Sequence, residues 1–128
     1  MIIIFECHSL LARALSLVFK DAGESIIFPS VEITTRRAAL EFLIKHDENI
    51  SSILISSYAS FKNTSQITDY EGLDILEDIL ILEELDDIPK VLYGFDPIER
   101  LAAQGKELPF DDYNELFQFV KLPGRFIE

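Results

Sequence analysis

The sequence predicts a single α/β domain, spanning 1–128, that is built on a parallel β-sheet. Short apolar runs alternate with segments of helical periodicity, and no internal repeat or low-complexity tract interrupts them. Such alternation is typical of βαβ units, in which the strands lie parallel. The length of 128 residues suits one domain with one hydrophobic core. We therefore expect five strands separated by helices.

Composition and charge limit the possible functions. Apolar residues make up 48% of the chain, which rules out a disordered protein. The 23 acidic and 11 basic residues give a formal charge of −12, which disfavours direct binding to nucleic acid or to an anionic membrane. The single cysteine cannot form an internal disulfide, and no apolar run approaches the roughly 20 residues of a membrane span. With no basic leader before the first strand, we expect a cytoplasmic protein.

The first strand is predicted at residues 2–6, where four consecutive bulky apolar residues leave no solvated face. Ser9 is predicted to cap the helix that follows, and Gly23 to close it. The apolar positions of this helix recur with a period of 3.6 residues at Leu10, Leu11, Ala14, Leu15, Val18 and Phe19. We expect these side chains to face the sheet.

A short second strand is predicted at residues 26–28, and Pro29 indicates that it ends early or lies near an edge of the sheet. Thr34 or Thr35 can open the second helix, at residues 36–45. The residues expected to be buried in this helix are Ala39, Leu40, Leu43 and Phe42.

The third strand is predicted at residues 53–57, followed by a polar loop over 58–71 that is long enough to indicate function or disorder. The third helix, at 73–85, is apolar nearly all round and should be more buried than a surface helix. Pro89 introduces a fourth strand at 90–95.

The last third of the chain predicts one more helix and one more strand. The run Asp96 to Glu99 has the residues of a helix start, with a capping Asp followed by Pro at the first helical position. This short helix would continue through Ala103, and Gly105 would stop it. The fifth strand is expected at 116–120, directly before Lys121-Leu122-Pro123.

This order of elements and the closing Lys-Leu-Pro resemble the receiver domain of bacterial response regulators, over about residues 1 to 123. The resemblance implies a flavodoxin-like three-layer sandwich. Family receivers carry an acidic pair after the first strand, an aspartate phosphoacceptor after the third, a Thr or Ser after the fourth, and a Lys-Pro step after the fifth. The corresponding pocket here would consist of Glu6, Cys7, Ser56, Ser57, Gly94 and Lys121.

The resemblance implies that this pocket is degenerate. Glu6 matches one acid of the pair and Cys7 replaces the other, while Ser57, or Ser56 if the strand is shorter, falls on the phosphoacceptor position. Gly94 stands where the hydroxyl residue would be, whereas Lys121 matches the family's lysine. In addition, Gly72-Leu73 resembles the family's Asp-Gly-Leu step, displaced by a longer loop.

Aspartyl phosphorylation requires a carboxylate nucleophile and a divalent cation held by several carboxylate oxygens. A serine hydroxyl has no negative charge to help hold that cation, and Glu6 is the one obvious ligand. We therefore expect a pseudo-receiver that has no catalytic residue, metal or cofactor and that signals through protein contacts. Glu6, Ser56 and Ser57 also have a plain structural interpretation as strand-end residues, and Lys121 could pair with Glu6 by charge alone.

Two other kinds of chemical site have weaker support in the sequence. A thiolate–imidazole pair from Cys7 and His8 is disfavoured, because adjacent residues generally point apart and no third orienting group can be assigned. A zinc site from these two residues and His46 lacks the usual paired spacing of ligands.

The third predicted helix carries the most distinctive surface signal, because no Lys or Arg occurs from Asn63 to Pro89. Acids there can surround an exposed apolar patch, an arrangement that suits docking of a basic protein partner. The residues of this predicted docking site are Asp74, Glu77, Asp78, Ile81, Leu82, Glu83 and Glu84.

The family's last helix is missing or truncated, since only residues 124–128 follow the final strand motif. The flank beside Leu11, Leu15 and Phe19 is therefore expected to be covered by a homodimer partner or by further domains, with this chain as an N-terminal module.

Two alternative functions stay open. One is an acidic decoy or inhibitor that occupies a basic cleft, and the other is a divergent, active phosphotransfer receiver that uses Asp69 or another loop acid.

Overall fold

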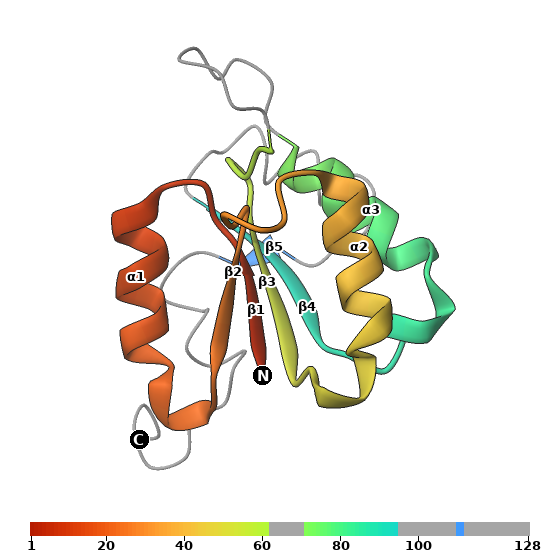
Figure 1. Cartoon of the computed structure of the whole chain (residues 1–128), viewed down its shortest axis with the longest axis horizontal. Coiled ribbons are helices and arrows are strands. Elements are labelled where there is room, and N and C mark those ends of the chain that lie inside the picture. The colour runs from red at the N-terminus through yellow and green to blue at the C-terminus, as the bar shows by residue number, and fades with distance from the viewer. Residues whose placement is uncertain (62–70, 95–109, 112–128) are drawn as a thin grey trace.

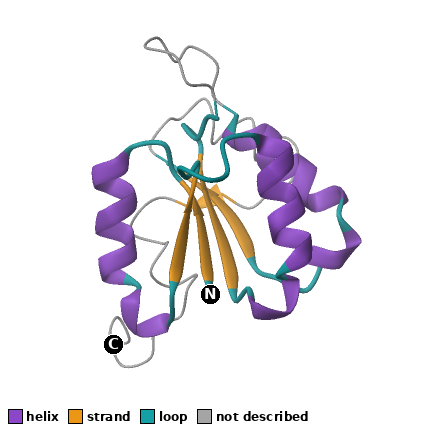
Figure 2. Ribbon diagram, viewed as in Figure 1, coloured by secondary structure: helices purple, strands orange, loops and turns teal. Residues whose placement is uncertain are grey.

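The computed structural model describes residues 1–61, 71–94 and 110–111. These residues form a parallel sheet with helix α1 on one face and helices α2 and α3 on the other (Figures 1 and 2). The predicted α/β class and the layered arrangement are therefore confirmed. No helix in these ranges has both the length and the apolar character needed to cross a membrane.

The sheet has the strand order β2-β1-β3-β4-β5, and every neighbouring pair is parallel. Its strands are β1 (Ile2–Phe5), β2 (Ser25–Phe28), β3 (Ser52–Ser56), β4 (Lys90–Tyr93) and β5 (Phe110–Asp111). Phe5 at the end of β1 is in register with Phe28 of β2 and Ile55 of β3. The carboxyl ends of these central strands therefore meet at one edge of the sheet, where open α/β sheets bind their ligands.

The prediction of five strands is met only in part. The described sheet has four strands of four or five residues and a two-residue β5, which lies in the acidic segment before the predicted fifth strand. The predicted strand at 116–120, the helix from Asp96 to Ala103 and its stop at Gly105 all lie outside the described residues.

Helix α1 (Ser9–Val18) begins one residue earlier than predicted, because Ser9 was expected to be the cap and is instead the first residue of the helix. The cap is His8 rather than Ser9, because Nδ1 of His8 accepts a hydrogen bond from the N–H of Leu11 at 3.3 Å. A single 3₁₀ turn, η1 (Lys20–Ala22), follows the helix. It ends at Gly23, whose φ of +133° is a conformation that favours glycine.

The inward face of α1 agrees with the prediction in part, since four of the six predicted residues pack on the sheet: Leu11, Leu15, Val18 and Phe19. Ala12, Leu15 and Phe19 are buried, whereas Leu10 and Ala14 are exposed. The physical reason is the helical repeat. Phe19, Leu15 and Ala12 are spaced so that they share one side of the helix, and burying that side turns positions 10 and 14 away from the sheet.

Strand β2 and helix α2 (Arg36–Lys45) follow the predictions closely. β2 lies at the edge of the sheet, as Pro29 indicated. Thr35, one of the two predicted caps, accepts a hydrogen bond on Oγ1 from the N–H of Ala38 at 3.1 Å. The predicted inward residues of α2 are buried (Ala39 and Leu43) or half-buried (Leu40 and Phe42).

The predicted third helix is interrupted. Helix α3 (Gly72–Ile81) ends before Leu82, whose backbone is extended, and a separate 3₁₀ turn, η3 (Glu83–Leu85), follows. This turn brings the side chain of Leu85 into the core. A continuous helix would place Leu85 elsewhere. Helix α3 is also less buried than predicted, since Leu80 and Ile81 are exposed.

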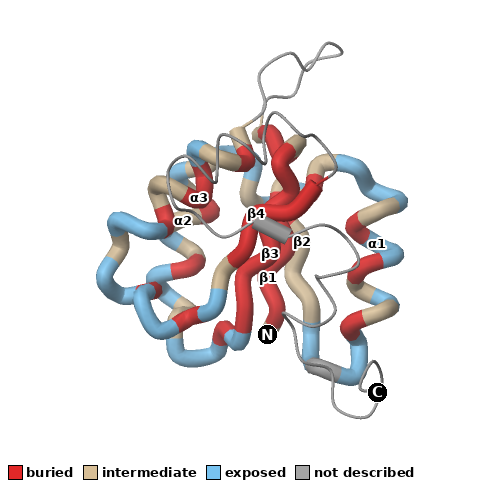
Figure 3. Tube along the Cα trace, turned by 180° about the vertical axis from the view of Figure 1, so that it is seen from behind, coloured by how far each residue is buried: buried red, intermediate tan, exposed pale blue. Residues whose placement is uncertain are grey.

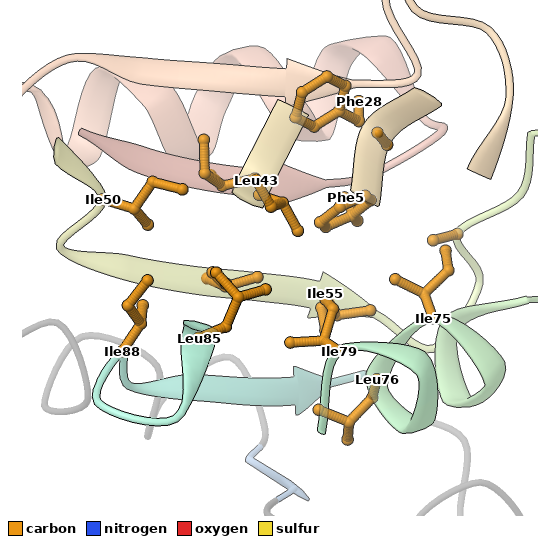
Figure 4. Close-up of a cluster of buried hydrophobic side chains, with 14 of the residues drawn as sticks. Phe5, Phe28, Leu43, Ile50, Ile55, Ile75, Leu76, Ile79, Leu85 and Ile88 are labelled. Carbon is orange, nitrogen blue, oxygen red and sulfur yellow. The ribbon is translucent and has the colours of Figure 1, made fainter. Parts of the chain in front are cut away.

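Hydrophobic side chains fill both faces of the sheet. The larger cluster, between the sheet and α2, α3 and η3, includes Phe5, Ile55 and Ile79 (Figure 4). The smaller cluster packs Ile4 and Leu54 against Leu15 of α1. Burying each such side chain contributes about 1.5–3 kcal/mol to folding. The central strands are therefore fully buried, while the outer sides of the helices are exposed (Figure 3).

Candidate functional site

The carboxyl ends of β1, β3 and β4 bring together most of the predicted pocket. Glu6 follows β1, Ser56 ends β3 with Ser57 directly after it, and Gly94 follows β4. All four are buried. The ladder continues past β3, because the N–H of Ser57 donates to the carbonyl of Tyr93 at 2.8 Å. Of the other two predicted pocket residues, Cys7 directly follows Glu6, whereas Lys121 lies outside the described residues, so its predicted pairing with Glu6 stays a prediction.

Glu6 is a buried acid whose two carboxylate oxygens both accept hydrogen bonds. Oε1 accepts from the hydroxyl of Tyr93 at 2.8 Å, and Oε2 accepts from the backbone N–H of His8 at 3.2 Å. One donor thus comes from β4 and the other from the start of α1. These bonds satisfy a polar group that would otherwise be costly to bury.

Sequence reasoning missed Tyr93. The available signal was a tyrosine directly after the apolar pair Val91-Leu92 in a predicted strand, because a buried tyrosine hydroxyl usually needs a hydrogen-bond partner. Tyr93 lies 87 residues from Glu6, and only the strand order brings the two together.

Cys7 is a protonated thiol that supports the backbone. Its Sγ donates to the carbonyl of Tyr58 at 3.0 Å. Burial raises the pKa of this thiol, the neighbouring Glu6 raises it further, and backbone hydrogen bonds oppose the shift. Cys7 therefore lacks the thiolate character that a nucleophile requires.

The histidines near the predicted chemistry have structural roles. His8 uses Nδ1 to cap α1, and the ring of His46 packs on Phe42 at a centroid distance of 4.4 Å, at the end of α2. Within 1–61, 71–94 and 110–111, no three His, Cys, Asp or Glu side chains are grouped so that they could hold a metal ion.

The two serines at the end of β3 place hydroxyls where receiver domains, which the sequence resembles, carry an aspartate. Oγ of Ser56 accepts a hydrogen bond from the N–H of Tyr58 at 3.1 Å, which shapes the turn after the strand. Oγ of Ser57 has no hydrogen-bond partner among the described residues and is buried. Neither side chain supplies negative charge.

Gly72 places the start of α3 directly against these serines. A Cβ atom at position 72 would lie 2.1 Å from the carbonyl oxygen of Ser56 and 2.9 Å from the Cα of Ser57. No larger residue fits without moving the backbone. The Gly72-Leu73 step singled out in the sequence therefore lies beside Ser56 and Ser57.

Glu71 joins the two ends of the long loop, and sequence reasoning did not identify it. Its Oε2 accepts hydrogen bonds from the N–H of Phe61 at 2.7 Å and from Oγ of Ser60 at 3.3 Å. Its own N–H donates to the carbonyl of Ala59 at 2.7 Å. The side chain also pairs with Arg36 of α2 at 3.4 Å. Asp69, the loop acid of the active-receiver alternative, lies outside the described residues.

Some residues of the predicted acidic docking site are exposed to solvent, and others are held by contacts within the chain. Asp74, Ile81, Glu83 and Glu84 are exposed. Asp78 is half-buried and pairs with Nε of Arg36 at 3.0 Å. Glu77 is half-buried, and Leu82 packs against the core. Together with exposed Leu80, the exposed residues form what we call the α3 surface: Asp74, Leu80, Ile81, Glu83 and Glu84.

Comparisons with known proteins identify the fold. A scan against protein-family models finds no match, and a search of curated proteins finds none. Among solved structures, the chain is similar to the bacteriophytochrome response regulator AtBRR, with a TM-score of 0.61. The two are 17% identical, and the match covers 99% of this chain and 94% of that one. At this identity the likeness shows a receiver-like fold alone.

Proposed function

We propose that this chain is a non-catalytic, receiver-like signalling module that acts through protein contacts without aspartyl phosphorylation. One observation carries the proposal. At the ends of β1 and β3 the described side chains supply one carboxylate, Glu6, and both of its oxygens are engaged by Tyr93 and His8.

The chemistry of phosphoryl transfer explains why this arrangement matters. Carboxylate oxygens from several residues are needed to hold the divalent cation that neutralises the phosphoryl charge. Turning Glu6 toward such a cation would break its bond to Tyr93 and leave a buried hydroxyl without that partner, at a cost of about 1–3 kcal/mol. Ser56 and Ser57 provide no charge to offset this cost.

The α3 surface supplies the proposed protein contact. Ile81 is 76% exposed and follows Leu80 in the chain, and the acids Glu83 and Glu84 come two and three positions after it. An apolar patch flanked by acids suits a partner surface that is apolar and basic. The decoy alternative has less support, because it needs carboxylates along an extended face, whereas Asp78 and Glu71 are both engaged by Arg36.

Intact mass spectrometry after incubation with acetyl phosphate and Mg²⁺ tests the absence of phosphorylation. We expect no added phosphoryl group, while an active receiver in the same reaction gains one. A phosphoryl group that hydroxylamine removes would be an acyl phosphate on Asp or Glu, and it would overturn the proposal.

A further inference from the structure

The outward side of α1 carries an apolar stripe that the sequence pattern did not predict. Leu10 is 72% exposed and Leu17 is 63% exposed. Arg13 and Ala14, both exposed, lie between them. Residues at positions i, i+3, i+4 and i+7 share one side of a helix, so these four side chains form a continuous surface. We call it the α1 stripe.

The α1 stripe also lies in a segment without acids, although the chain as a whole is strongly acidic. From Cys7 to Lys20 there is no Asp or Glu, whereas Arg13 and Lys20 are both exposed. The segment from Glu71 to Pro89 has the opposite character, with many acids and no Lys or Arg. Helix α1 and the segment of α3 and η3 therefore differ in charge.

The two surfaces face away from each other within one molecule. Helix α1 covers one face of the sheet and α3 covers the other (Figure 1). They cannot meet in the same copy, but each is available to another molecule.

We propose that the α1 stripe of one copy docks on the α3 surface of a second copy, so that the chain self-associates head to tail. This inference rests on the docking role proposed above for the α3 surface and names its partner. Leu10 and Leu17 would contact Leu80 and Ile81, while Arg13 would approach the acids of the α3 surface.

Charge favours this pairing over the symmetric ones. Two α1 stripes packed together would bring Arg13 of both copies close, with no acid in either helix to offset them. Two α3 surfaces packed together would oppose acids to acids. Only the mixed contact joins opposite charges, and such head-to-tail contacts build rings or open chains rather than closed dimers.

Sedimentation velocity over a range of protein concentrations tests the proposal. We expect concentration-dependent species larger than a dimer, which diminish as NaCl is raised because salt screens the charge attraction. Leu17→Glu and Ile81→Asp should each weaken association by more than about tenfold. Val31→Asp is the matched control, since Val31 is 98% exposed in the segment between β2 and α2, and it should associate like the unmodified chain.

Mixing the two weakened variants gives the sharpest result. An equimolar mixture of Leu17→Glu and Ile81→Asp should form dimers that grow no further, because one intact α1 stripe meets one intact α3 surface. A chain that is monomeric at every concentration would overturn the proposal. So would a dimer that survives Ile81→Asp but not Leu17→Glu, since that pattern indicates a symmetric α1 contact. Neither result bears on phosphorylation, which the mass measurement decides separately.

Discussion

The carboxylate of Glu6 is buried at the end of β1 and connects neighbouring elements. Its hydrogen bonds to Tyr93 and to the N–H of His8 tie the end of β1 to β4 and to the start of α1. Cys7 adds a link to Tyr58, after β3. The residues at the strand ends therefore connect neighbouring elements.

Tyr93→Phe tests this structural role. Removing the hydroxyl leaves Oε1 of Glu6 without its donor, so we expect the free energy of unfolding to fall by about 1–3 kcal/mol in urea denaturation. A double-mutant cycle with Glu6→Gln should give a coupling energy of about 0.5–3 kcal/mol, because the two side chains touch. A Tyr93→Phe variant within about 0.5 kcal/mol of the unmodified chain would contradict this role.

The sequence predicted which residues gather at the strand ends, but not what they do there. Glu6, Ser56, Ser57 and Gly94 were placed correctly because parallel strands end at one edge of the sheet. The bond from Tyr93 to Glu6 could not be predicted, because it depends on the side-chain geometry of two strands far apart in the chain.

Arg36 connects three elements on the other face of the molecule. From the first turn of α2 it pairs with Glu71 at the base of the loop and with Asp78 on α3. Glu71 in turn accepts the N–H of Phe61. The orientation of α3, and with it the α3 surface, therefore depends partly on this small charge network.

Arg36→Ala should lower the free energy of unfolding by about 0.5–1 kcal/mol at low ionic strength, because both ion pairs are only partly buried. The loss should shrink when unfolding is measured in high salt. Arg37→Ala is the matched control, since its pair with Glu41 is largely exposed, and it should change stability by less than about 0.5 kcal/mol. Equal losses in both variants would show that the network contributes nothing specific.

Element positions were easier to predict than element faces. Helix α2 was predicted with its observed bounds, because Thr35 and the spacing of its apolar residues indicate them clearly. The face of α1 was predicted only in part: Leu10 and Ala14 are exposed, because apolar residues occupy most positions and the periodicity does not single out one side. The break at Leu82 was missed for a similar reason, since apolar residues continue through it.

At the scale of the whole molecule, the sheet separates two unlike surfaces. One side carries the apolar, basic α1 stripe and the other carries the acidic α3 surface. The described strand ends carry buried serine hydroxyls and the buried acid Glu6, whose oxygens both accept hydrogen bonds. We therefore infer that this receiver-like fold communicates through its two helical faces, and that the strand-end pocket stabilises the arrangement.

The central claim is that the strand-end pocket does not respond to a cation or to a phosphoryl group. Its most direct test is a two-dimensional ¹H–¹⁵N spectrum recorded during titration with Mg²⁺, and then with Mg²⁺ and beryllofluoride as a phosphoryl mimic. We predict no saturable shift of the amide signals of Glu6, Ser56 and Ser57, while an active receiver treated alike responds. Saturable shifts concentrated at the ends of β1 and β3 would contradict the account.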